Sequence, residues 1–311
     1  MRHRIALLSV LFAALPQLVA AVSEDALRLR NLGLAELENE QPAKAEELFL
    51  QLVPLTPDDP LPLANLAITA LRQQNFEAGI EWIEKSLAKS PDQPELLTIK
   101  AEILQWSGQP EAALPVFRRA ADLAPDSVEI QYALARQAST LPSEEAAAAK
   151  SEALERLRTL RPENLVVLMQ SGQLQLAAGD RAAATGTFLR VKEVIWQAPA
   201  AASQLLEQIL TALEAGDFEA SRVPSLRLEN VVKITPMFKE GLRELSPGIQ
   251  GVPLTRFVDE PPATSFGEPL AVKFSSSPLS DTGTTRGGLA LGDFDGDGRT
   301  DWARLTSGVP G

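Results

Sequence analysis

Between residues 22 and 222 the chain consists of helix-like stretches of apolar and small residues, and several of these stretches are closed by a proline. Pro57, Pro91 and Pro125 follow one another at intervals of 34 residues. Because proline has no backbone N–H and disfavours a helical conformation in the residue before it, each of the three is expected to end a helix. A constant interval of this length indicates a solenoid of stacked repeats.

Small and aromatic residues fall in register with these prolines. The first unit contains Gly33, Ala45 and Phe49, and later units repeat the positions with Ala67, Gly79, Ile83, Ala101, Gly108, Ala113, Phe117 and Ala120. The pattern resembles the tetratricopeptide repeat (TPR), a helix–turn–helix unit of about 34 residues. Small residues such as Gly33 let the first helix of a unit approach the second closely, and Phe49 and Phe117 fill the space between units.

The repeats become less regular towards residue 222. Pro162 lies 37 residues after Pro125, which predicts a slightly longer fourth unit. A fifth unit contains Gly172, Gly179, Asp180 and Phe188, and a sixth repeats the turn as Gly216-Asp217-Phe218 before its second helix fails near Pro224. We therefore predict an all-α superhelical solenoid of five to six repeats over residues 22–222, in which the sixth unit is a cap.

Solenoids of this kind bind partner segments along a concave surface lined by their first helices. The repeat register places seven side chains there: Arg30, Arg72, Thr98, Glu102, Tyr132, Arg136 and Gln173. The arginines suit a carboxylate or an acidic peptide, although a solvated surface role is the plainer interpretation of each. The lysine and asparagine set with which some TPR proteins clamp a C-terminal carboxylate is incomplete here, so recognition of a chaperone tail is not expected.

The composition changes after Arg222. Prolines become frequent over residues 223–286, and glycine and serine increase. Two short apolar runs, 228–234 and 270–274, are predicted to be strands. The rest of 223–286 is expected to be an extended connector.

The sharpest motif of the chain follows this connector, at Asp293-Phe294-Asp295-Gly296-Asp297-Gly298-Arg299-Thr300-Asp301. Carboxylates at alternate positions of a tight loop can converge on one hard cation, and oxygen-only ligation favours Ca²⁺. The glycines permit the backbone turns that such a loop needs. The predicted ligands are the side chains of Asp293, Asp295, Asp297 and Asp301 and the backbone carbonyl of Arg299.

The motif differs from an EF-hand, because an EF-hand requires glutamate at the twelfth loop position and this chain has Arg304 there. Its spacing resembles the FG-GAP/VCBS repeat of integrin-like β-propellers, with 288–292 and 302–305 as short flanking strands. A propeller has four to eight blades, whereas the sequence ends at Gly311. Residues 287–311 are therefore expected to be a partial repeat at the start of a propeller in a longer protein.

The N-terminus has the three-part layout of a secretory signal peptide. A basic head, Met1 to Arg4, precedes an apolar core, and cleavage is predicted after Ala21. An uncleaved membrane anchor is the alternative, because the apolar stretch approaches the length of about 20 residues that a span needs. Pro16 and the small residues before the predicted cleavage site favour cleavage. The sequence thus predicts export to the periplasm or the cell exterior, without stable membrane insertion afterwards.

Composition narrows the chemistry further. The chain has no cysteine, and its one histidine, His3, lies in the predicted leader. This excludes cysteine nucleophiles, serine–histidine–aspartate triads and zinc, haem or iron–sulfur sites built on His or Cys in the mature chain. The formal net charge of −12 makes nucleic acid an unfavourable partner.

Taken together, these features predict an exported, non-catalytic scaffold that binds a protein or peptide partner, with Ca²⁺ as a structural ion. One alternative is the N-terminal part of a secreted β-propeller enzyme or adhesin, whose catalytic or ligand site lies beyond residue 311. A weaker alternative is an assembly factor in the periplasm in which the repeats act alone.

Overall fold

The computed structural model describes residues 23–195 and 199–246 and the backbone of two strands, 288–292 and 301–305. Two compact units divide the chain, residues 1–259 and 260–311, and each is considered by itself. The described helices of the first unit are α1 (Glu24–Glu38), α2 (Pro42–Leu52), η1 (Val53–Leu55), α3 (Leu61–Arg72), α4 (Phe76–Lys89), α5 (Pro94–Trp106), α6 (Pro110–Leu123), α7 (Val128–Ala138), α8 (Glu144–Leu160), α9 (Leu165–Ala178), α10 (Arg181–Val194), α11 (Ala200–Ala215), α12 (Phe218–Val232) and α13 (Pro236–Leu245).

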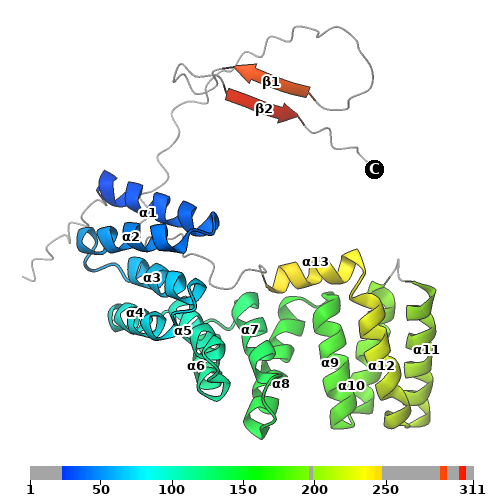
Figure 1. The fold of residues 1–311 in the computed structure, drawn as a ribbon. Coiled ribbons are helices and arrows are strands. Elements are labelled where there is room, and N and C mark those ends of the chain that lie inside the picture. Colours follow the sequence, from blue (N-terminus) through cyan, green and yellow to red (C-terminus); the bar gives the residue numbers. More distant parts are fainter. Residues whose placement is uncertain (1–22, 196–198, 247–287, 293–300, 306–311) are drawn as a thin grey trace, which may run out of the picture. The chain divides into compact units, whose positions relative to one another are not determined.

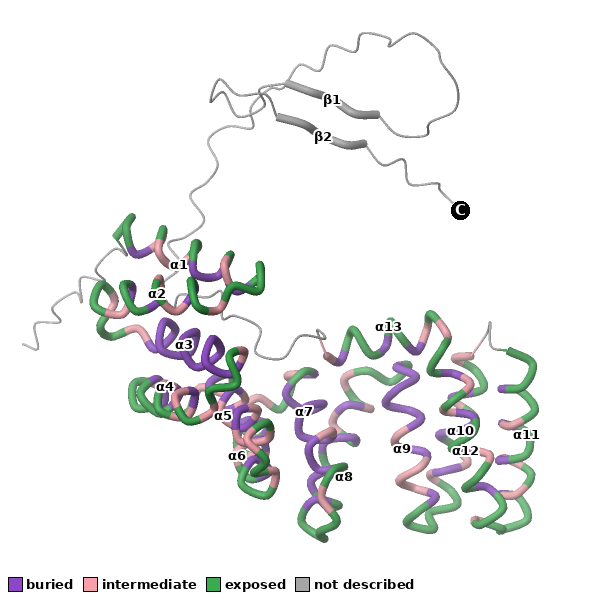
Figure 2. The backbone as a smooth tube through the Cα atoms, viewed as in Figure 1, coloured by how far each residue is buried: buried purple, intermediate pink, exposed green. Residues whose placement is uncertain are grey.

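These helices pack as antiparallel pairs, from α1 with α2 to α11 with α12 (Figure 1). In the first five pairs the second helix also packs against the first helix of the next pair, as in α2 with α3 and α4 with α5. The predicted all-α solenoid is therefore present. Figure 2 shows that buried residues run along the faces where helices meet, and that α3 is buried from Leu61 through Leu71.

The close approach predicted within each repeat is visible at two glycines. A Cβ atom added to Gly33 would lie 2.6 Å from Phe49, and one added to Gly172 would lie 2.9 Å from Phe188. Both phenylalanine rings are fully buried. Each ring therefore occupies the space that a side chain on the facing first helix would need, and this contact sets the spacing of the helix pair.

The turns between the two helices of a repeat share a left-handed residue. It is Glu40, Gln74, Gly108, Gly179 and Gly216 in five of the six pairs. Asp180 and Asp217 then cap the second helix, because each carboxylate accepts a hydrogen bond from a backbone N–H three residues on. These two Gly-Asp turns, predicted from the sequence, are confirmed.

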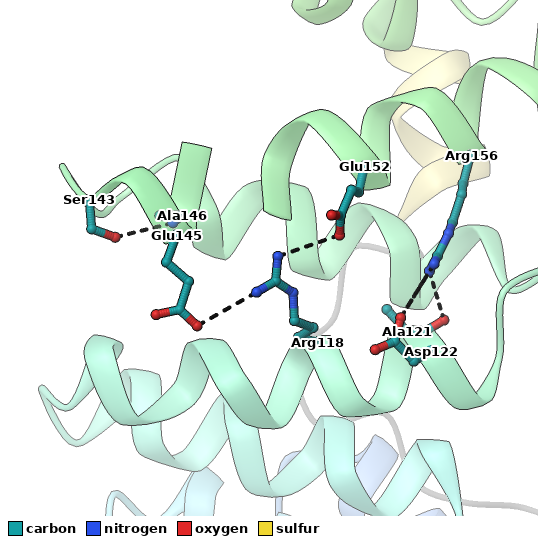
Figure 3. A network of polar contacts seen from close by, with 8 residues as sticks. All are labelled: Arg118, Ala121, Asp122, Ser143, Glu145, Ala146, Glu152 and Arg156. Carbon is teal, nitrogen blue, oxygen red and sulfur yellow. Dashed lines mark hydrogen bonds and ion pairs between the residues drawn. The ribbon is translucent and has the colours of Figure 1, made fainter. Parts of the chain in front are cut away.

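Neighbouring second helices are also joined by ion pairs (Figure 3). Arg118 on α6 lies 3.6 Å from Glu145 and 3.4 Å from Glu152, both on α8. Arg156 on α8 reaches back to Asp122 at 3.3 Å and donates a hydrogen bond to the carbonyl of Ala121. Ion pairs as exposed as these contribute at most about 1 kcal/mol each, so they fix the register of adjacent repeats more than they stabilise them.

The predicted boundary at residue 222 is wrong. Helix α12 continues through Pro224 to Val232, so 228–234 is not a strand, and α13 follows it. Ser221, Ser225, Leu228 and Val232 recur at helical intervals and are all buried. The burial of this face outweighs the cost of about 3 kcal/mol that proline imposes within a helix, which explains why Pro224 does not end α12.

The second unit contains an antiparallel hairpin of β1 (Gly288–Gly292) and β2 (Asp301–Leu305). Gly288 pairs with Leu305, and Gly292 pairs with Asp301. Of the predicted calcium ligands, Asp301 is the first residue of β2, whereas Asp293, Asp295, Asp297 and Arg299 lie outside the described residues. The predicted leader at 1–21 and the predicted strand at 270–274 also lie outside them.

The glycine–phenylalanine contact gives a first prediction. Gly172→Ala should lower the free energy of unfolding by about 1–3 kcal/mol, because the new methyl group overlaps the Phe188 ring in a packed core. The matched control is Gly186→Ala in the same repeat, where an added Cβ meets no atom within 4 Å. That change should raise stability by about 1 kcal/mol through helix propensity. Urea unfolding measures both, and equal effects of the two substitutions would contradict the packing argument.

Candidate functional site

All seven residues predicted to line the groove lie on first helices. Arg30 is on α1, Arg72 on α3, Thr98 and Glu102 on α5, Tyr132 and Arg136 on α7, and Gln173 on α9. Helices α1 and α7 are separated in the array by α3 and α5, and packed helices lie about 8–10 Å apart. Arg30 and Arg136 therefore cannot grip one carboxylate together.

Two of these residues on the N-terminal helices bond to backbone carbonyls. The Arg72 guanidinium donates a hydrogen bond to the carbonyl of Leu37, near the end of α1. The Thr98 hydroxyl donates to the carbonyl of Pro94, one turn back along α5, at 2.9 Å. Arg72 thus links two neighbouring first helices, and both side chains are half-buried.

Glu102 and Arg136 form an ion pair between α5 and α7. The closest N–O distance is 4.0 Å, and the side chains are 15% and 35% exposed. Each residue is also half-buried, so the pair lies on the surface of the first-helix layer and not within its core. An ion pair of this distance and exposure contributes at most about 1 kcal/mol.

Tyr132, one turn before Arg136 on α7, is buried. Burial raises the pKa of its phenol, and the hydrogen bond with Gln170 on α9 and the charge of Arg136 offset this only in part. The phenol therefore stays protonated at neutral pH. Gln170 is a residue that the sequence analysis did not select.

The polar cluster extends to the C-terminal helices. The Gln173 amide on α9 donates a hydrogen bond of 2.8 Å to the Glu229 carboxylate on α12, and Lys233 lies 2.8 Å from the same carboxylate. Helix α12 packs against α9 as well as against its own partner α11. Sequence analysis missed Glu229 and Lys233 because it assigned both to the connector. The helical spacing of Leu228 and Val232 was the available signal.

Glu229 is held ionised by this cluster. Burial raises the pKa of its carboxyl group, but hydrogen bonds from Lys233 and Gln173 and the charges of Lys233 and Lys150 outweigh burial and leave the pKa below its ordinary value. A carboxyl group of this kind stabilises the fold above its unfolded-state pKa. That contribution is lost as the pH falls through the folded-state pKa.

A second helix contact on this surface involves Asn164, the N-cap of α9. Its side-chain oxygen accepts hydrogen bonds from the backbone N–H groups of Val166 at 3.1 Å and Val167 at 3.3 Å. Its side-chain nitrogen donates to the carbonyl of Gly241 at 2.9 Å and to the Glu244 carboxylate at 3.1 Å, both on α13. All the hydrogen-bonding capacity of this buried amide is therefore used.

No three acidic or histidine side chains converge on a possible metal position within the described residues. Among the helices that the structure describes, none has the length and apolar character to cross a membrane.

Comparisons with known proteins agree with the repeat geometry. The tetratricopeptide repeat family matches residues 94–136, which span α5, α6 and most of α7. With the other helix pairs built in the same way, the helical array is a TPR-type solenoid. A search of curated proteins found no match.

Several solved structures are similar to the chain. The Pseudomonas aeruginosa protein PilF shares 18% identity over 71% of this chain and 98% of its own, with a TM-score of 0.48. MamA from Desulfovibrio magneticus RS-1 shares 22% identity over 56% of this chain and 97% of its own, with a TM-score of 0.46. YrrB, described as a TPR protein with an unusual peptide-binding site, shares 14% identity over 55% and 87%, with a TM-score of 0.43.

The Glu229 cluster gives a second prediction. Glu229→Gln should lower the free energy of unfolding at pH 7 by about 1.5–3 kcal/mol, the range for hydrogen bonds to a charged group. The difference from the parent should shrink as the pH falls below about 4.3, the ordinary glutamate pKa, because the parent then loses the ionised carboxylate. Urea unfolding between pH 7 and pH 3 tests this. Glu219→Gln, on the exposed side of α12, is the control with a small effect throughout, and a pH-independent difference for Glu229→Gln would refute the assignment.

Proposed function

We propose that this protein is an exported, non-catalytic scaffold that binds a segment of a partner protein on the first-helix face of its TPR solenoid, and that its C-terminal loop binds Ca²⁺. The observation that carries the binding proposal is the placement of all seven predicted groove residues on successive first helices, α1 to α9. TPR arrays bind protein or peptide partners on such surfaces.

The two halves of this face differ in what they offer a partner. Gln173 donates a hydrogen bond to Glu229 of the chain's own helix α12, and Tyr132 lies electrostatically close to Glu229 and to Lys233 at the end of that helix. Arg30, Arg72 and Thr98 lie on α1, α3 and α5, which α12 and α13 do not cover in the packing of the described helices. We therefore place the partner segment on the N-terminal half, where Arg30 and Arg72 favour a segment with carboxylates.

Export and calcium binding are supported by the sequence. The basic head, the apolar core and the small residues before the predicted cleavage site within residues 1–21 support secretion. The D-x-D-G-D-G-x-x-D spacing supports a calcium loop, and its resemblance to FG-GAP/VCBS repeats favours the alternative that this chain is the N-terminal part of a secreted β-propeller enzyme or adhesin. Further D-x-D-G-D-G repeats in frame downstream of Gly311 would support that alternative.

Site-specific photo-crosslinking tests the binding face. A photoreactive residue at position 98 on α5 should give a discrete adduct with one partner in the cells that make the protein. The same residue at position 112, an exposed alanine on the second helix α6 of the same repeat, should give none. Adducts from position 112 alone, or identical adducts from both positions, would contradict binding on the first-helix face.

Calorimetric titration of the full chain tests the calcium loop. The parent should bind one Ca²⁺, and the double substitution Asp295→Asn and Asp297→Asn should weaken binding at least tenfold, because neutral amides replace two charged ligands. Asp281→Asn, outside the motif, is the matched control and should leave the affinity unchanged. Equal affinities for the parent and the double variant would show that the loop is not the calcium site.

A further inference from the structure

Helix α13 does not cap the end of the solenoid. A capping helix would pack on the last pair, α11 and α12, and cover its outer face. Instead, α13 packs against α9 and α7, the first helices of the two preceding repeats. Figure 1 shows α13 lying across these helices. Its position is that of a helix bound to the array, although it belongs to the same chain.

The contact that α13 makes is small and amphipathic. Phe238, Gly241 and Leu245 are its buried residues, spaced by three and four positions along one face. Lys239, Glu240, Arg243 and Glu244 are exposed. This is the arrangement by which a separate amphipathic helix lays its apolar face on a receiving surface.

Asn164 recognises α13 at one position along the helix. It donates hydrogen bonds to the Gly241 carbonyl and to the Glu244 carboxylate, which lie three residues apart on α13. A Cβ atom added at Gly241 would lie 3.1 Å from the Asn164 side chain. The surface therefore favours a small residue at this position and a carboxylate one turn later.

An open pocket lies beside α13. It measures about 780 Å³, is open to solvent, and has a wall that combines apolar residues such as Leu165, Ile195 and Met237 with charged ones such as Arg161 and Glu240. The α13 surface therefore has open space next to Met237.

From these contacts we propose that α13 is an internal ligand, and that the surface formed by α7 and α9 receives an amphipathic helix of the same pattern from a partner protein. The pattern is an aromatic residue, glycine three positions on, a carboxylate three positions after that, and leucine next, as in Phe238, Gly241, Glu244 and Leu245. This inference rests on the proposed function, because it adds a second, helix-binding surface to the same scaffold. Binding of the partner helix requires release of α13.

Gly241→Leu tests the release, because the new side chain collides with Asn164 while the receiving surface on α7 and α9 keeps its sequence. Hydrogen exchange of the α13 amides should accelerate at least tenfold in this variant. Lys239→Leu, which introduces the same side chain at an exposed position of α13, is the matched control and should leave exchange unchanged. Unaltered exchange in Gly241→Leu would overturn the proposal.

A labelled peptide of residues 234–246 then probes the vacated surface of the full chain. Its affinity, measured by fluorescence anisotropy, should be at least tenfold higher for Gly241→Leu than for the parent or for Lys239→Leu. Adding Asn164→Asp to Gly241→Leu should abolish this gain. Aspartate still caps α9, but it cannot donate to the peptide and it repels the carboxylate.

Equal peptide affinity for the parent and Gly241→Leu would overturn the proposal, as would dimers of the parent that exchange α13, since the occupant would then be a second copy of this chain. If Gly241→Leu loses its helical circular dichroism, Asn164→Asp alone replaces it in the exchange experiment, with the same expected acceleration. Failure of the peptide to bind while position 98 still crosslinks a partner would reject this inference and leave the proposed function intact.

Discussion

The contact between a glycine on the first helix and a phenylalanine on the second sets the geometry of the repeats in which it occurs. Gly33 and Phe49 make it in the first pair, and Gly172 and Phe188 make it in the fifth. Because the ring fills the position of the missing side chain, the two helices can approach closely without a cavity. That spacing determines which residues of each first helix point away from the second helix, and so which side chains are available for a partner.

This dependence explains why much of the fold could be predicted from the sequence. The interactions that define one repeat are local, and they recur at an interval that the prolines mark. Turn chemistry is local too, as the Gly179-Asp180 and Gly216-Asp217 turns show. In the first two repeats Glu40 and Gln74 take the left-handed turn position instead of glycine. Glutamate and glutamine are not residue types that indicate a left-handed turn, so only the 34-residue interval relates Glu40 and Gln74 to Gly108.

The C-terminal helices could not be predicted in the same way, because their determinants are distant in sequence. Pro224 indicates a break when it is considered with its neighbours alone, yet the burial of Leu228 and Val232 carries α12 past it. Asn164 resembles an ordinary N-cap in the sequence, and its second role depends on Gly241, which lies 77 positions away. Glu229 belongs to the polar cluster only because α12 packs against α9, and that packing is not apparent from the residues around Glu229 in the sequence.

Helix α9 shows why α12 and α13 fold back at all. Its sequence, Leu165-Val166-Val167-Leu168-Met169 and onward, is apolar around most of its circumference, and a helix of that kind must be covered on every side. Helices α8 and α10 cover it as its repeat neighbours, and α12 and α13 cover what remains. Because α12 covers part of α9, its polar side chains lie next to Gln173. As a result, Gln173 stabilises the C-terminal end of the solenoid, whereas Arg30, Arg72 and Thr98 lie on first helices that α12 and α13 do not cover.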